Sequence, residues 1–142
     1  MQYSTNTLHR ISLALPLALA LGLAVAPPVF ADDPGVVEMG KQRFMENCAV
    51  CHGDEAKGGG PFVPLLKAAP SDLTTLSARN DGEFPFNRVY DMVDGRTMPL
   101  AHGTPEMPIW GSEWKRKSML GGETEVRGRV LEMIVYLRSI QQ

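Results

Sequence analysis

The sequence predicts an all-α protein, because apolar residues recur at helical spacing near both ends of the body of the chain and no segment shows strand-like alternation. The clearest helix is the last one. Its apolar face is formed by Val126, Val130, Met133, Ile134, Leu137 and Ile140. Glu123 and Glu125 precede that face and suit the positively polarised start of a helix.

The first helix of the body is predicted over residues 34–47. Asp33 is a favourable N-cap, and Pro34 is a favourable first helical residue. Behind them, small or apolar residues recur every three or four positions, at Val37, Gly40, Phe44 and Cys48. The sequence therefore predicts a helix at each end of the body.

Two shorter helices are predicted between them. One runs from Ser71, as N-cap, to Ala78. The other carries an apolar stripe and ends at Gly95; the stripe is Phe86, Val89, Tyr90 and Val93. The segment 53–70, rich in Gly and Pro, and the proline-containing segment 96–111 are predicted to be loops. Loops of such length commonly wrap a ligand or carry function.

The composition limits the classes of function. The chain has 142 residues, of which 44% are hydrophobic, 14 are Gly and 11 are Pro. So short a chain has little apolar material for a core and normally needs something besides its own side chains to complete it. A formal net charge of -2 argues against nucleic acid as a partner. Two cysteines exclude a framework of several disulfides.

Residues 1–31 are predicted to be a secretory signal peptide. An apolar run from Ile11 to Ala26 follows His9 and Arg10, and the segment ends at Ala31, a residue type that signal peptidase accepts. The alternative is an uncleaved membrane anchor, against which the internal prolines argue. We expect residues 32–142 to form one domain in a bacterial periplasm, without stable membrane insertion after cleavage.

The two cysteines stand in the sequence Cys48-Ala49-Val50-Cys51, directly followed by His52. One helical turn spaces the two sulfurs for thioether bonds to the vinyl groups of a haem, and the adjacent imidazole can bind the iron. A zinc site would need four ligands, and a thioredoxin-like dithiol would need a βαβ setting that the sequence lacks. A structural disulfide would close a loop too short to stabilise much.

The chain resembles the small class I c-type cytochromes. The motif from Cys48 to His52 is the most specific part of the resemblance, and the flanking residues that share it are Gly40, Phe44, Met133, Tyr136 and Leu137. The resemblance implies a cytochrome c-like fold, in which the N- and C-terminal helices pack across each other around one covalently bound haem c, with long connecting loops. It also implies one-electron transfer and export, because this family attaches its haem outside the cytoplasmic membrane.

If His52 is one axial ligand of the iron, the second loop offers three candidates for the other: Met98, His102 and Met107. Both methionines precede a proline, which favours an extended backbone. The family pattern is a loop methionine followed by proline, and Met107-Pro108-Ile109-Trp110-Gly111 resembles its variant with an aromatic residue and a glycine. We therefore predict Met107, with Met98 and His102 as alternatives; His102 would lower the reduction potential.

The resemblance also implies a residue outside the ligand set. The carbonyl of Pro61 is expected to accept a hydrogen bond from the other ring nitrogen of His52, with Pro64 as the alternative. Three arginines are candidates to neutralise the haem propionates: Arg79, Arg88 and Arg96.

The leading functional hypothesis is a soluble periplasmic monohaem cytochrome that is not an enzyme. It would carry single electrons between redox proteins such as a periplasmic dehydrogenase, an oxidase or a membrane electron-transfer complex. The alternative is a haem-bearing subunit of a periplasmic dehydrogenase complex, with segment 92–119 as the expected contact surface. A haem sensor or gas binder, with His102 or no ligand at the sixth position, and a thiol oxidoreductase are further alternatives.

Overall fold

The computed structural model describes residues 33–97, 107–119 and 122–142, and all regular structure in them is helical. The elements are α1 (Pro34–Asn47), α2 (Ala49–His52), the 3-10 turn η1 (Val63–Leu65), α3 (Phe86–Asp94), α4 (Trp110–Lys117) and α5 (Glu123–Ser139). The predicted all-α class is confirmed. The predicted signal peptide over residues 1–31 lies outside the described residues. Within the described ranges, no helix has the length and apolar character needed to cross a membrane.

The first helix begins and ends where the sequence predicts. The carboxylate of Asp33 accepts a hydrogen bond of 2.8 Å from the backbone N–H of Gly35, and Pro34 occupies the first turn. At the other end, the backbone N–H of Cys48 donates to the carbonyl of Phe44. Local capping and spacing therefore suffice to define α1.

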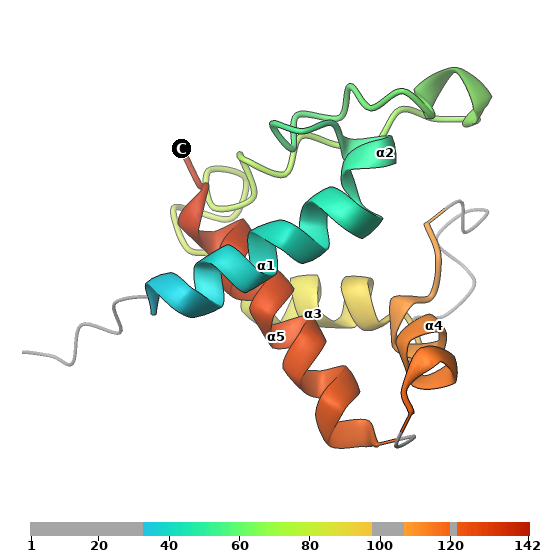
Figure 1. Ribbon diagram of the computed structural model, residues 1–142. Helices are drawn as coiled ribbons and strands as arrows, with labels where there is room; N and C mark the ends of the chain where they lie inside the picture. Colours follow the sequence, from blue (N-terminus) through green and yellow to red (C-terminus); the bar gives the residue numbers. More distant parts are fainter. Residues whose placement is uncertain (1–32, 98–106, 120–121) are drawn as a thin grey trace, which may run out of the picture. The chain divides into compact units, whose positions relative to one another are not determined.

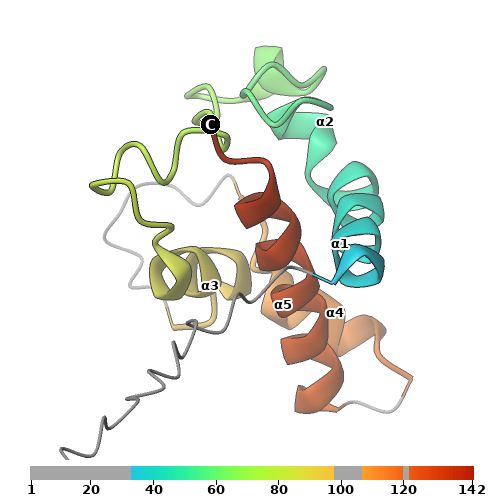
Figure 2. The ribbon, with the colours of Figure 1, turned by 90° about the vertical axis from the view of Figure 1, so that its left-hand side faces the viewer.

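The main helix contact is the crossing of α1 and α5, which Figure 1 shows; in Figure 2 the two helices lie side by side. Gly40 makes it possible, because a Cβ atom there would collide with the backbone carbonyl of Glu132 and lie 2.7 Å from the Cβ of Tyr136. One turn further along α1, the rings of Phe44 and Tyr136 pack with centroids 5.3 Å apart. The predicted crossing of the terminal helices is confirmed.

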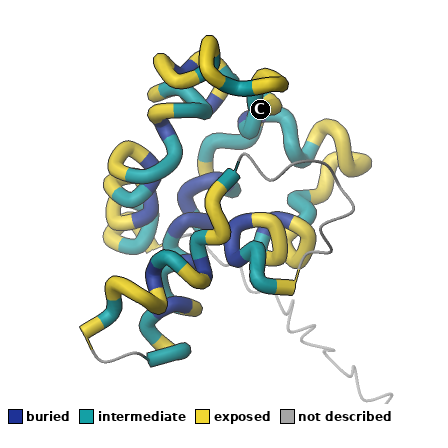
Figure 3. Tube along the Cα trace, turned by 90° about the vertical axis from the view of Figure 1, so that its right-hand side faces the viewer, coloured by how far each residue is buried: buried dark blue, intermediate teal, exposed yellow. Residues whose placement is uncertain are grey.

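Helix α5 is at the centre of the helix packing, because it contacts α1, α3 and α4. Its buried side chains are Val126, Val130, Met133, Ile134, Tyr136 and Leu137. They pack with Phe44 of α1, Val89 and Val93 of α3, and Trp114 of α4. The buried positions accordingly gather between these helices (Figure 3).

The helix predicted from Ser71 to Ala78 does not form; the segment is a series of turns. Its backbone groups have other partners. The carboxylate of Asp72 accepts hydrogen bonds from both the backbone N–H and the hydroxyl of Thr74. The side chain of Gln141 accepts from the N–H of Ser77, and the carbonyl of Thr74 accepts from Gln142. Capping residues and the distant end of the chain thus satisfy the groups that a helix would have paired.

Helix α4 is a difference from the sequence-based prediction, which places a loop over 96–111 and no helix between that loop and the last helix. The N-cap position, Ile109, offers no side-chain hydrogen bond, so the usual signal for a helix start is absent. Trp110 and Trp114 lie one turn apart, with ring centroids at 5.6 Å, and Trp114 is buried. Packing of this face, rather than capping, stabilises the helix.

Candidate cofactor-binding site

The two cysteines and the histidine are placed by one helical turn at the end of α1. The backbone N–H groups of Cys51 and His52 both donate to the carbonyl of Cys48, at 3.0 and 2.8 Å. Helix α2 then ends at Gly53, whose positive φ of 74°, combined with a ψ of 157°, is a conformation that glycine adopts far more readily than other residues. The sequence motif is therefore folded as the compact turn that its spacing predicts.

The loop after the motif folds back against α2. Carbonyls of the motif accept backbone hydrogen bonds from it: His52 from Gly58 at 2.8 Å, Cys51 from Gly60 at 3.1 Å. Gly60 is needed for this approach, because a Cβ atom there would lie 2.6 Å from the carbonyl oxygen of Ala49. The loop thus fixes the backbone that carries the three predicted site residues.

A cavity of about 650 Å³ brings the predicted ligands together. Cys48, Cys51 and His52 line it, and so does Met107 from the distant segment before α4. Much of the remaining lining comes from apolar residues, among them Phe44, Leu73, Leu76, Val89, Met92, Met133 and Leu137. Binding sites for cofactors have this volume range and this combination of an apolar lining with a few polar groups.

His52 lines the cavity with one of its two ring nitrogens buried and unsatisfied. Burial lowers the pKa of His52, and the backbone of Ser71, close to the ring, partly opposes this shift. Its Nδ1 atom is buried and has no hydrogen-bond partner within the described part of the chain. An imidazole in this state suits a site that another group completes, because an unpaired buried nitrogen is costly.

The chemistry of the thiols separates the alternatives for the cysteine pair. Both cysteines are free. Burial, and secondarily the charge of Cys51, raise the pKa of Cys48 to about 12. Redox-active Cys-X-X-Cys thiols have lowered pKa values, so this environment disfavours a thiol oxidoreductase. In the ranges that the structure describes, no group of three or more His, Cys, Asp or Glu side chains is arranged to hold a metal ion.

The other predicted residues are placed as follows. Met98 and His102, the alternatives to Met107, lie outside the described residues. Pro61 is exposed and is not part of the cavity lining, whereas Pro70 and Ser71 are. Sequence reasoning missed this pair, because the return of the loop to the cavity depends on contacts such as the hydrogen bond from the N–H of Leu73 to the carbonyl of Ala56, which no local pattern records.

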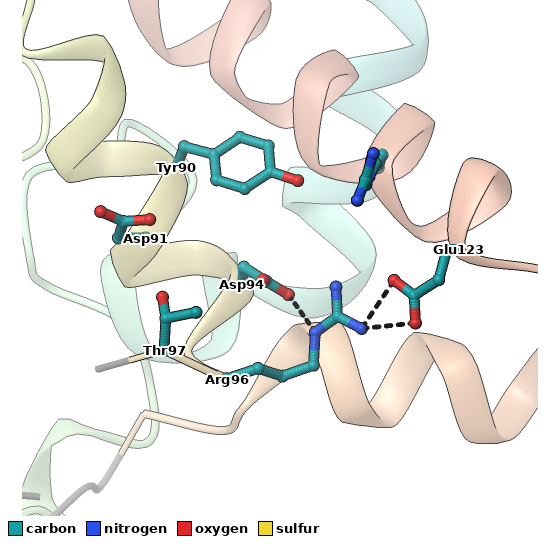
Figure 4. A pocket seen from close by; sticks show the side chains of 7 residues that line it. Tyr90, Asp91, Asp94, Arg96, Thr97 and Glu123 are labelled. Atoms are coloured by element: carbon teal, nitrogen blue, oxygen red, sulfur yellow. Dashed lines mark hydrogen bonds and ion pairs between the residues drawn. The ribbon is translucent and has the colours of Figure 1, made fainter. Parts of the chain in front are cut away.

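The three predicted arginines divide into two groups. Arg79 and Arg88 line the cavity, and Nη2 of Arg79 donates to the carbonyl of Asp72 at 2.6 Å. Arg96 instead pairs with Asp94 and Glu123 and lines a separate pocket (Figure 4). Of the residues that the structure describes, Arg79 and Arg88 are therefore the cationic side chains available to an anionic cofactor edge.

The residues present fit a covalently attached haem. Two free thiols one helical turn apart, a histidine with a buried and unsatisfied Nδ1 atom, a methionine thioether and two arginines meet in one largely apolar cavity. A helical fold built around such a site defines a c-type cytochrome.

The comparison with protein families agrees: the cytochrome c family model matches residues 37–111, and the chain belongs to this family. The chain accordingly carries covalently bound haem c and acts in electron transfer. No solved structure matches it significantly.

Three curated relatives are similar to the chain. A cbb3-type cytochrome c oxidase subunit FixPc of Rhizobium leguminosarum bv. viciae is 69% identical over 76% of this chain and 29% of its own length. A cytochrome-c peroxidase of Pseudomonas sp. (strain SCT) is 32% identical over 66% of this chain and 32% of its own. A cbb3-type oxidase subunit FixP of Rhizobium etli is 29% identical over 75% and 31%. The chain therefore spans less than a third of each relative.

Proposed function

We propose that this chain is a periplasmic monohaem cytochrome c that passes single electrons between redox proteins. Cys48 and Cys51 would hold the haem by thioether bonds, and His52 and Met107 would be the axial ligands. The observation that carries the proposal is the shared cavity of about 650 Å³, which these four residues line although Met107 is distant in sequence.

The haem, when bound, supplies an iron that alternates between the ferrous and ferric states. The residues of the chain itself hold the two iron ligands in position. His52 is fixed by the hydrogen-bonded turn of α2, and Met107 belongs to a segment anchored against α3 and α4. Ligands held in place in both oxidation states keep the reorganisation on electron transfer small, and the apolar lining excludes water.

A second candidate function is supported by the relatives. Two of them are named as subunits of cbb3-type cytochrome c oxidase, so the chain would serve as the electron-transfer part of a larger oxidase complex rather than as a freely diffusing carrier. This replaces the dehydrogenase complex of the sequence-based alternative with an oxidase. In both cases the chain itself transfers electrons and is not an enzyme.

Visible spectroscopy of the haem-loaded protein tests the ligands. The ferric form should show a methionine-to-iron charge-transfer band that is lost in Met107→Ala and retained in Met98→Ala and His102→Ala. Loss in Met98→Ala alone would overturn the assignment of Met107. Carbon monoxide should not bind the ferrous wild-type protein, since both axial positions are filled; rapid binding would favour a sensor.

Purification separates the carrier from the complex subunit. The tagged protein, expressed in its native host and extracted with mild detergent, should elute as a monomer that exchanges electrons with added redox proteins. Stable co-elution with oxidase subunits, through several columns, would favour the second candidate.

A further inference from the structure

The segment that carries Met107 is attached to the end of α3. Gly95 terminates α3 with a φ of 70°, and a Cβ atom there would lie 3.2 Å from the Cα of Ile109. Gly111 is even closer: a Cβ atom on it would collide with Oδ1 of Asp94, lie 2.5 Å from Nε of Arg96 and 2.8 Å from the carbonyl oxygen of Asp94. The backbone just after Met107 therefore lies directly on the Asp94–Arg96 pair.

This pair is part of a larger ion network. Nε of Arg96 donates to Oδ1 of Asp94 at 2.7 Å, and Nη1 donates to both carboxylate oxygens of Glu123 at 2.9 Å. Lys115 of α4 donates to Glu123 at 2.7 Å. Figure 4 shows the guanidinium of Arg96 between the two carboxylates. One arginine thus joins the end of α3 to the start of α5, and Glu123 joins both to α4.

Part of this ion network is shielded from water, where ion pairs are stronger than on the surface. The side chain of Asp94 is 7% exposed and that of Arg96 is 24% exposed, so the link between them is largely shielded from water. Hydrogen bonds from Lys115 and Arg96 lower the pKa of Glu123 to about 2, and bonds to Asp94 and Glu123 raise the pKa of Arg96. Partly buried, multiply bonded pairs of this kind hold geometry better than single exposed pairs.

We propose that Arg96 is a positioning residue for the methionine ligand: its ion pairs with Asp94 and Glu123 fix the surface on which Gly111 rests, and thereby hold Met107 toward the iron. The inference rests on the proposed role of Met107. It assigns Arg96 a function different from the propionate contact that the sequence suggested. Without the ion pairs of Arg96, Met107 should still bind the iron most of the time, but its rate of dissociation from the iron should rise.

Ligand exchange measures this directly. Ferric haem-loaded protein is mixed with saturating imidazole, and the rate at which the methionine charge-transfer band disappears reports how fast Met107 dissociates. Arg96→Met should raise this rate about tenfold, the effect of losing roughly one charge-assisted hydrogen bond. Arg96→Lys, which keeps the charge, should recover part of the loss. Glu123→Gln, at a more exposed position, should raise the rate by a smaller factor.

Arg129→Met is the matched control. Arg129 is 25% exposed, as Arg96 nearly is, but it makes a single pair within α5, with Glu125 at 2.5 Å, and it lines neither the cavity nor the pocket of Arg96. Its exchange rate should equal that of the wild type. The positioning role would be overturned if Arg96→Met and Arg129→Met raised the exchange rate equally, or if neither Arg96→Met nor Glu123→Gln raised it. In either case, loss of the band in Met107→Ala would leave the ligand assignment intact. A band that survives in Met107→Ala would overturn the ligand assignment, and this inference with it.

Discussion

Gly40 on α1 lies directly against the backbone of Glu132 on α5, and a Cβ atom on Gly40 would overlap the Glu132 carbonyl oxygen. Backbone atoms in the middle of a helix cannot move aside as a flexible side chain can. The crossing of the two terminal helices, and with it the position of Phe44 and the cysteine turn, therefore depends on the absence of one methyl group.

Gly40→Ala should destabilise the haem-loaded protein by about 2 kcal/mol, because overpacking at the crossing exceeds the gain of up to about 1 kcal/mol from better helix propensity. Chemical denaturation monitored by circular dichroism measures the difference. The matched variant is Gly128→Ala on α5, where an added Cβ meets nothing within 4 Å. It should stabilise the protein by about 0.5–1 kcal/mol. Stabilisation by both changes would show that the crossing has room for a side chain.

The sequence predicted α1, α3 and α5 because their determinants are local. Asp33 caps α1, and Gly95 ends α3 in the left-handed conformation. The failed helix from Ser71 to Ala78 shows the limit of local reasoning, since the side chain of Gln141 bonds to Ser77 and Leu73 across more than 60 positions of the chain. No pattern around Ser71 records such a partner.

In the candidate site, too, the part that is local in sequence could be predicted and the part that depends on distant contacts could not. Cys48, Cys51 and His52 lie within five consecutive positions, so their spacing alone predicted that one turn would bring them together. The approach of Pro70 and Ser71 could not be predicted, because it depends on a loop in which Ala56 has a φ of 59° and its carbonyl accepts from the N–H of Leu73. Met107 does line the cavity, and its role as ligand stays a prediction.

Protein without the haem should be largely unfolded. Without the haem, the apolar residues that line the cavity of about 650 Å³ would face water, and this lost burial is large against the small total stability of a short domain. The Cys48→Ser/Cys51→Ser double variant, prepared free of haem, should show low helicity by circular dichroism and poor amide dispersion by NMR. A cooperative unfolding transition in this apoprotein would contradict the expectation.

Arg88→Met should lower the reduction potential of the haem, on the order of tens of mV. Arg88 lines the cavity, and its positive charge opposes the additional charge of the ferric iron; removing it favours the oxidised state. Spectroelectrochemical titration gives the potential. Arg116→Met is the control, because Arg116 pairs with Glu113 on α4 and lies outside the cavity lining. An unchanged potential in Arg88→Met, or the same change in both variants, would count against Arg88 as a charge near the cofactor.

The carboxylate of Glu123 should contribute to stability in a defined range of acidic pH. Lys115 and Arg96 lower its pKa from 4.5 to about 2 in the folded protein, while Asp94, Asp91 and Arg127 are the other charged groups of the same pocket. A lowered folded-state pKa means that the unfolded chain binds the proton first as the pH falls. The contribution is therefore complete above about pH 4.5 and is lost between there and about pH 2.

The measurement compares the urea midpoints of the wild type and Glu123→Gln from pH 7 to pH 2. The wild type should be more stable by a constant margin above pH 5, and the margin should shrink as the pH falls through the range of the carboxylate. In Lys115→Met, which removes the largest cause of the lowered pKa of Glu123, the margin should disappear at a higher pH. A margin that stays constant down to pH 2 would show that Glu123 stabilises the protein through packing, and that its charge has no part in holding α3, α4 and α5 together.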